Sequence, residues 1–246
     1  MNSKSHTIKY LYADIDNITN NIISTPVPKD NNSNGVLEPP VNFPQPVIKI
    51  INANCFEVAN QYNPNDIIIH NFANNKHQGG PCSKFTEEGT YISNEFWSNT
   101  QEDQIIKKYQ KKIVLPKSMY PICNNYILNG EGLLYSVCDD LPSVITIAAL
   151  QDPNYMKKQQ RQTMINRIKL ILVVCAKYNK NLITGLWGCG AFGGKPDDLA
   201  EFWKEALADK TIPKPKEIIF AIKIDNASSK WGSFEDMEKL FRKLGN

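Results

Sequence analysis

The sequence has few metal-binding side chains and no long apolar run. It contains only three histidines, and its six cysteines lack the C-x-x-C spacing of zinc and redox motifs. We therefore expect no metal site, and we interpret the cysteines as reduced thiols that lie mostly in the core. Residues 1–10 lack the apolar core of a signal peptide, and no run is long enough to span a bilayer. These absences predict an intracellular protein, cytoplasmic or nuclear, without a membrane partner.

A strong charge of either sign is also absent. The net charge is +3 and the pI is about 8.4, so no general attraction to nucleic acid follows and no direct nucleic-acid partner is expected. The 246 residues suit one sizeable domain, which we expect to be monomeric. Because residues 24–46 are rich in Pro and Asn, we expect a partly irregular extension over residues 1–46 and a compact domain over residues 47–246.

Short apolar runs alternate with helical patterns along this domain. The runs that are typical of buried strands are residues 47–51, 67–73, 133–137, 144–150, 182–187 and 218–224. Helical spacing of apolar residues indicates helices over about residues 155–178, 199–207 and 234–244. This alternation predicts an α/β layered sandwich with a mostly parallel or mixed sheet. We expect the basic residues of the first helix, including Arg167, to form a solvated face, and Asp197 or Asp198 to cap the second.

A glycine-rich segment, residues 185–194, separates one strand from the helix that follows. Its sequence is Gly-Leu-Trp-Gly-Cys-Gly-Ala-Phe-Gly-Gly, and we call it the glycine loop. Glycines such as Gly188, Gly190, Gly193 and Gly194 tolerate positive φ and can turn successive N–H groups toward one anion. The N-terminus of the next helix adds the positive end of its dipole. The pattern therefore predicts a phosphate-binding loop, and the alternative is a tight turn without a ligand.

Three polar turns follow predicted strands, and all three are expected at the carboxyl edge of the sheet, where open α/β sheets bind ligands. They are residues 52–54, residues 71–88 and the glycine loop. In the second turn, Gly79 and Gly80 allow close approach of the backbone to a sugar or phosphate, and Glu87 and Glu88 follow. Neighbouring side chains point in different directions, so one carboxylate can bind ribose hydroxyls while the other reaches the anomeric carbon. The alternative is that both glutamates only form the charged first turn of a helix.

Hydrolysis of a glycosidic bond passes through an oxocarbenium-like state. It needs a carboxyl group that protonates the leaving group or activates water. Burial beside a diphosphate would raise the pKa of such a carboxyl through desolvation and like-charge repulsion. His77 is a weaker acid–base candidate, because a loop histidine is usually solvated. No residue pattern supplies a base for Cys82 or Cys189 as a nucleophile.

Together these turns resemble the microbial-type poly(ADP-ribose) glycohydrolases of the macrodomain superfamily. The letters Gly188-Cys-Gly-Ala-Phe-Gly193 are similar to the diphosphate-binding loop of that family. Asn71-Phe-Ala, the glycine pair and Glu87-Glu88 resemble its catalytic loop, and Asn52-Ala-Asn54 resembles the turn that meets the adenine. The resemblance extends from about Val47 to Ile224 and implies a three-layer α/β/α sandwich, macrodomain-like, with a mixed central sheet.

The resemblance also implies roles for individual residues. Glu88 would be the catalytic acid/base, Glu87 would bind the ribose next to the scissile bond, and Phe192 would pack against the distal ribose. The implied ligand-binding residues are Asn54, Asn71, Gly79, Gly80, Gly188, Cys189, Gly190, Ala191, Phe192 and Gly193. The implied activity is removal of ADP-ribose from ADP-ribosylated protein or from poly(ADP-ribose), with no metal and no cofactor.

The sequence departs from the family pattern in both turns. The usual glycine triplet is Gly79-Gly80-Pro81, the spacer before the carboxylates is short, and Thr86 stands where glutamine is usual. Asn54 stands where an aspartate commonly meets the adenine amino group, and its side-chain oxygen can still accept that hydrogen bond.

Two other functions stay open. One is a reader module that binds ADP-ribose without cleaving it. The other is a nicotinamide-dependent oxidoreductase, because residues 188–193 satisfy G-x-G-x-x-G. That fingerprint expects an acidic residue about 20 positions further on, at the end of the next strand, whereas Asp225 is more distant.

Overall fold

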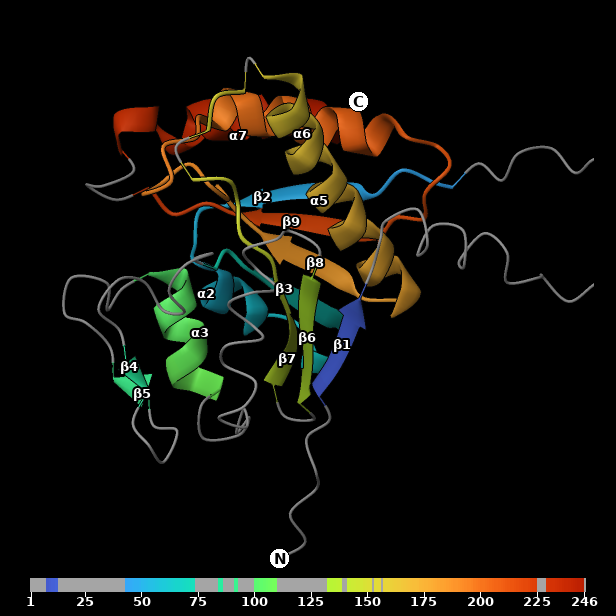
Figure 1. The fold of residues 1–246 in the computed structure, drawn as a ribbon, viewed down its shortest axis with the longest axis vertical. Coiled ribbons are helices and arrows are strands. Elements are labelled where there is room, and N and C mark those ends of the chain that lie inside the picture. The colour runs from blue at the N-terminus through green and yellow to red at the C-terminus, as the bar shows by residue number, and fades with distance from the viewer. Residues whose placement is uncertain are drawn as a thin grey trace, which may run out of the picture.

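The computed structural model describes residues 8–12, 43–73, 84–85, 91–92, 100–109, 132–138, 141–151, 153–155, 157–224 and 229–245. Their main feature is a seven-stranded sheet in the order β1-β6-β7-β3-β8-β9-β2 (Figure 1). Its strands are β1 (Ile8–Tyr12), β2 (Val47–Ile51), β3 (Ile67–Asn71), β6 (Gly132–Cys138), β7 (Leu141–Thr146), β8 (Asn181–Thr184) and β9 (Glu217–Ala221). A separate two-stranded ribbon consists of β4 (Lys84–Phe85) and β5 (Tyr91–Ile92).

The sheet is mixed. Strands β7, β3, β8, β9 and β2 pair in parallel, while β6 pairs antiparallel with β7 and β1 pairs antiparallel with β6. All five residues of β3 are buried, as expected for a central parallel strand that is covered on both faces. Because the five parallel strands run the same way, their carboxyl ends share one edge of the sheet.

Helices cover both faces of the sheet (Figure 1). On one face lie α5 (Lys158–Lys177), α6 (Pro196–Ala208) and α7 (Phe234–Arg242), and they form one core with the sheet. On the other face, α2 (Cys55–Ala59) and α3 (Gln101–Tyr109) contribute to a second core. The expected three-layer α/β/α sandwich with a mixed sheet is thus confirmed. Among the described residues, no helix combines the length and apolar character that crossing a bilayer requires.

Each of the six predicted strands is present, although their bounds shift by a few residues. β7 begins at Leu141, three positions before the expected start, and pairs there with β6. The segment before residue 47 contributes β1, which extends the sheet at its β6 edge. The division of the chain at residue 47 stays a prediction.

The start of α6 differs from the expected one. Lys195 occupies the N-cap position and Pro196 the first helical position, while Asp197 and Asp198 lie in the first turn. The prediction of an aspartate N-cap was therefore wrong. Proline suits the first helical position because its φ is already helical and its missing N–H would have no partner within the helix.

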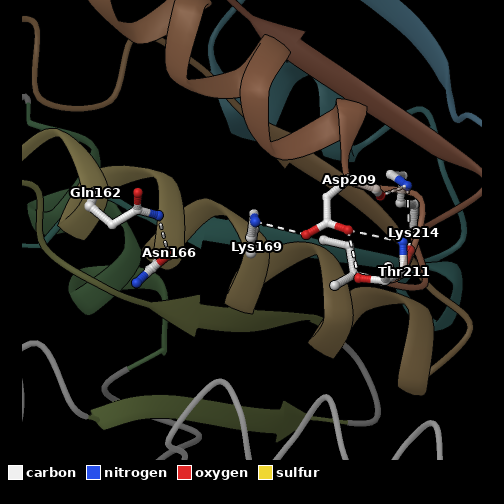
Figure 2. Close-up of polar contacts among 7 residues, drawn as sticks. Gln162, Asn166, Lys169, Asp209, Thr211 and Lys214 are labelled. Atoms are coloured by element: carbon white, nitrogen blue, oxygen red, sulfur yellow. Dashed lines mark hydrogen bonds and ion pairs between the residues drawn. The ribbon is translucent and has the colours of Figure 1, made fainter.

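A polar contact joins α5 to the C-terminal end of α6 (Figure 2). Lys169 Nζ lies 2.7 Å from Asp209 Oδ2, and the Thr211 hydroxyl donates to Asp209 Oδ1 at 2.6 Å. Partial burial of the carboxyl opposes its ionisation, but the hydrogen bonds from Lys169 and Thr211 outweigh this effect and lower the pKa of Asp209 to about 2.

We expect Asp209→Asn to reduce the free energy of unfolding at pH 7 by about 1 kcal/mol, since the pair is partly exposed. The folded pKa lies below the unfolded value, so the contribution of Asp209 is complete above about pH 4 and is lost as pH falls toward 2. Urea unfolding at several pH values from 7 to 3 should show the difference from the wild type shrinking. Gln162→Ala, which removes an exposed contact to Asn166 on α5 (Figure 2), is the control. A difference that stays constant down to pH 3 would contradict this account.

Candidate functional site

A pocket of about 520 Å³ lies where the parallel strands end. Its walls come from the segments that follow β2, β3, β8 and β9, together with the first turn of α3 and the 3₁₀ turn Ser229–Trp231. The lining residues are Asn54, Cys55, Phe56, Phe72, Gln101, Gln104, Leu186, Cys189, Gly190, Ala221, Ile222, Lys223 and Trp231. Parallel strands place their carboxyl ends at one edge, which is where α/β sheets bind ligands.

Asn54 lines this pocket and also caps α2. Its Oδ1 accepts hydrogen bonds from the backbone N–H groups of Phe56 and Glu57, at 3.0 and 2.9 Å. The Glu57 carboxylate accepts a hydrogen bond from the Asn54 N–H at 2.9 Å and forms an ion pair with Lys223 at 3.1 Å. The side-chain oxygen of Asn54 is therefore used in the cap, and its Nδ2 group is the remaining polar group of that side chain.

The glycine loop joins β8 to α6. Gly188 and Gly193 have φ of +81° and +76°, which favours glycine at both positions. Internal bonds close the loop, because the Gly194 N–H donates to Gly188 O at 3.0 Å and the Gly193 N–H donates to Gly190 O at 3.2 Å. Of the four glycines expected to allow positive φ, Gly188 and Gly193 adopt it, whereas Gly190 and Gly194 do not.

Three consecutive amides of this loop have no acceptor within the described part of the chain. They belong to Gly190, Ala191 and Phe192, of which the first two are exposed and the third is half-buried. Unpaired N–H groups in such a turn form a concave site for an anion, and α6 begins only four residues after Phe192. The backbone here can therefore bind a phosphate group without a basic side chain.

The two cysteines of the pocket are not nucleophiles. Burial raises the pKa of the Cys55 thiol to about 12. Burial also raises the pKa of Cys189 to about 12, and the negative charges of Asp198 and Asp197 add to this effect. Both groups stay protonated at neutral pH, whereas a reactive cysteine needs a lowered pKa.

Buried hydrogen bonds hold the edge of the sheet under the glycine loop. The Trp187 indole N–H donates to Ile147 O at 3.1 Å, and His70 Nε2 lies 3.3 Å from the same oxygen. Thr184 Oγ1 lies 3.1 Å from His70 Nδ1. Burial lowers the pKa of His70 to about 3, so the ring is neutral and acts as a structural donor and acceptor.

Arg167 of α5 is buried and donates to Ala148 O at 2.7 Å. The expectation that this residue belongs to a solvated basic face was therefore wrong. The carbonyl of Ala148 lies beyond the end of β7, and a buried carbonyl requires a donor. Arg167 supplies that donor from the helix layer.

The structure brings together part of the expected site. Asn54, Cys189 and Gly190 line the pocket, and the glycine loop carries the other implied residues Gly188, Ala191, Phe192 and Gly193. The Asn71 side chain is not among the lining groups. It accepts from the Ala73 N–H at 3.2 Å and donates to Thr146 Oγ1 at 3.3 Å, so it shapes the end of β3. The other residues predicted for the site lie outside the described part of the chain: Gly79, Gly80, Glu87, Glu88 and His77.

The start of the expected catalytic segment nevertheless lies against the glycine loop. Ala73, the last described residue before the segment that contains Glu87 and Glu88, packs with Ala148 against Phe192. The exit of β3 is therefore in contact with the glycine loop through the Phe192 side chain.

The sequence analysis missed several lining residues, above all Phe72, Gln101, Lys223 and Trp231. One signal was present for Gln101. Thr100 and Asp103 have the spacing of a helix start, and the Thr100 hydroxyl accepts from the Asp103 N–H at 3.3 Å. A helix beginning at Gln101 could have been found, but its contact with the pocket could not.

Comparison with known proteins identifies the fold. No family model and no curated protein matches the chain. Among solved structures, poly(ADP-ribose) glycohydrolase from Deinococcus radiodurans in complex with ADP-ribose aligns with a TM-score of 0.59 and 18% identity, over 81% of this chain and 86% of that one. A single-residue variant of the same enzyme, also with ADP-ribose, gives 0.66 and 15% over 96% and 95%. The enzyme from Thermomonospora curvata gives 0.55 and 14% over 96% and 85%.

The mixed sheet, its two helical layers and the pocket at the carboxyl edge thus define a macrodomain-type fold. More particularly, the fold is similar to that of the poly(ADP-ribose) glycohydrolases from Deinococcus radiodurans and Thermomonospora curvata.

Two substitutions in the glycine loop test its backbone geometry through their effects on stability. Gly188→Ala places a side chain at φ +81°, with its Cβ 2.7 Å from the Ala149 Cβ, so we expect a loss of about 2 kcal/mol or more in the free energy of unfolding. The Cβ of Gly190→Ala meets no atom within 4 Å, so we expect this variant to keep wild-type stability within about 0.5 kcal/mol. Urea unfolding measures both values, and equal losses in the two variants would contradict the assigned loop geometry.

Proposed function

We propose that this chain is an ADP-ribosyl glycohydrolase. It binds ADP-ribose in the pocket at the carboxyl edge and releases it from ADP-ribosylated protein or from poly(ADP-ribose). The observation that carries the proposal is a run of three amides, Gly190 to Phe192, that have no acceptor among the described residues and lie beside a pocket walled by aromatic and aliphatic side chains.

The pocket suits the parts of this ligand. Its volume of about 520 Å³ lies in the range of small-molecule sites. Phe56, Phe72 and Trp231 offer apolar surface for a base, and the amides of the glycine loop can bind the diphosphate. The cation of Lys223 on the wall adds attraction for an anion. The first turn of α6 carries Asp197 and Asp198, so backbone amides rather than net charge would hold the phosphates.

The proposed chemistry is cleavage of the glycosidic bond at the anomeric carbon of the ribose. Glu88 would act as the acid/base, and Glu87 would bind the neighbouring ribose hydroxyls. The packing of Ala73 against Phe192 supports this assignment, because the last described residue before that segment contacts the glycine loop. A carboxyl group at that position can protonate the leaving group or activate water.

Replacement of the proposed acid/base tests the enzyme directly. We expect Glu88→Gln to lower the release of free ADP-ribose by at least about 100-fold, since general acid–base catalysis contributes about 10²–10⁴-fold. The dissociation constant for ADP-ribose, measured by calorimetry, should change by less than about threefold, because the amide keeps the size of the side chain. Glu201→Gln, at an exposed position on α6, is the matched control.

The assay should offer serine-, arginine-, acidic-residue- and ribose-linked ADP-ribose in parallel, so that it also identifies the linkage. Wild-type turnover in the Glu88→Gln variant would refute the assigned role. Binding of ADP-ribose by the wild type with no release from any substrate would favour the non-catalytic reader.

A ligand comparison separates the glycohydrolase from an oxidoreductase. A ligand that binds only the folded state at about 100 times its dissociation constant stabilises by about 2.7 kcal/mol. We expect ADP-ribose to raise the melting temperature by several degrees and NAD to raise it less, because the nicotinamide ribose would have to fit beside the proposed catalytic segment. Stabilisation by NAD alone would favour the oxidoreductase.

A further inference from the structure

One side chain joins three walls of the pocket. Gln101 is the first residue of α3, and its Nε2 donates to His70 O at 2.7 Å and to Cys55 Sγ at 3.1 Å. Its Oε1 accepts from the Phe72 N–H at 3.0 Å. The amide therefore contacts the end of β3 and the start of α2, and Gln101 itself lines the pocket.

These contacts compensate for a gap in the sheet. β3 pairs with β7 as far as Asn71, but its pairing with β8 ends at Ile69. Backbone groups of a strand alternate in direction, and Asn71 O faces β7 because it accepts from the Ile147 N–H. His70 O and the Phe72 N–H therefore face the side where β8 has already ended.

A glutamine side chain can replace a strand at this point. Its carboxamide has one carbonyl acceptor and an N–H donor in the same plane, as a peptide group has. By donating to His70 O and accepting from the Phe72 N–H, Gln101 continues the ladder past the last paired residue of β8. Without it, two backbone groups at the edge of the pocket would lose their partners.

Gln101 holds the last described residues before the stretch that contains Glu87 and Glu88. Phe72 lines the pocket, and the next residue, Ala73, has φ of +47° and packs against Phe192. The glycine loop is held separately, by its own hydrogen bonds and by the Trp187 bond to Ile147 O.

We propose that Gln101 is a positioning residue for the proposed reaction: its carboxamide holds the exit of β3, from which the chain continues to the proposed catalytic residues Glu87 and Glu88. This inference rests on the proposed function. It predicts that loss of the carboxamide affects turnover more than ligand affinity, because the phosphate-binding amides do not depend on Gln101.

The first test uses Gln101→Leu and Gln101→Glu, with Gln162→Glu as the matched control on the exposed surface of α5 (Figure 2). We expect Gln101→Leu to lower kcat by at least about tenfold, since small displacements of reacting groups cost about that much or more. Its dissociation constant for ADP-ribose should change by less than about threefold. An equal loss of affinity and of turnover would mean that Gln101 only supports the pocket as a whole, and would overturn the proposal.

The Gln101→Glu variant adds a pH signature. An ionised carboxylate would accept from the Phe72 N–H but repel His70 O, whereas a protonated carboxyl can donate to that oxygen. We expect the ratio of variant to wild-type kcat to rise by at least about fivefold from pH 8 to pH 5.5, because protonation restores the donor. The same ratio should stay flat for Gln101→Leu and for Gln162→Glu. A flat ratio in Gln101→Glu, with kcat already reduced, would contradict the hydrogen-bond mechanism.

The second test needs no ligand and no activity. Amide hydrogen exchange in the free protein should accelerate at Phe72 by at least about tenfold in Gln101→Leu, while the amides of the paired residues Ile69 and Ile183 keep their wild-type rates. Unchanged exchange at Phe72 would overturn the proposal even if the enzyme is active. Faster exchange in a chain that neither binds nor releases ADP-ribose would refute the proposed function and support the structural clamp, so the two failures are distinguishable.

Discussion

The carbonyl oxygen of Ile147 accepts from the Trp187 indole and lies within hydrogen-bond distance of His70, and this shared contact joins the ends of β7, β8 and β3. Ile147 is buried and lies just beyond the end of β7, and a buried carbonyl requires a donor. The pKa of His70 is lowered to about 3 by burial, so the ring stays neutral and this contact persists at physiological pH. The glycine loop begins directly after β8 and contains Trp187, one of the two residues in this contact.

Two kinds of backbone group therefore meet at the same edge. The carbonyls of Ile147 and Ala148 accept hydrogen bonds from the buried side chains of Trp187 and Arg167, which hold the backbone at this edge. The N–H groups of residues 190–192 have no partner within the described residues. Such amides, on a backbone that is already held in place, suit an anionic ligand because little reorganisation is needed when the ligand binds. Gln101 holds the exit of β3 in the same way.

Much of the fold could be predicted from the sequence because buried parallel strands are apolar over their whole length. The run Ile67-Ile-Ile in β3 is one example, and the strand predicted there is present. The sequence analysis did not predict β1 and α3. A five-residue strand and a nine-residue helix are too short for the spacing of their apolar residues to stand out. Arg167 was misplaced for a different reason. A basic residue on a helix is usually solvated, and only the buried carbonyl of Ala148, just beyond β7, explains why this one is buried.

The glycine loop follows from residue types alone, because the tolerance of Gly188 and Gly193 for positive φ is a property of glycine and needs no partner. The buried strands and their order along the chain follow from the apolar runs. Which side chains meet at the pocket depends instead on the packing of the folded layers. Gln101 bonds to residues 29, 31 and 46 positions away, and the oxygen of Asn54 is used by its own helix. Such pairings depend on how the layers pack, and packing brings together groups whose spacing in the chain carries no signal.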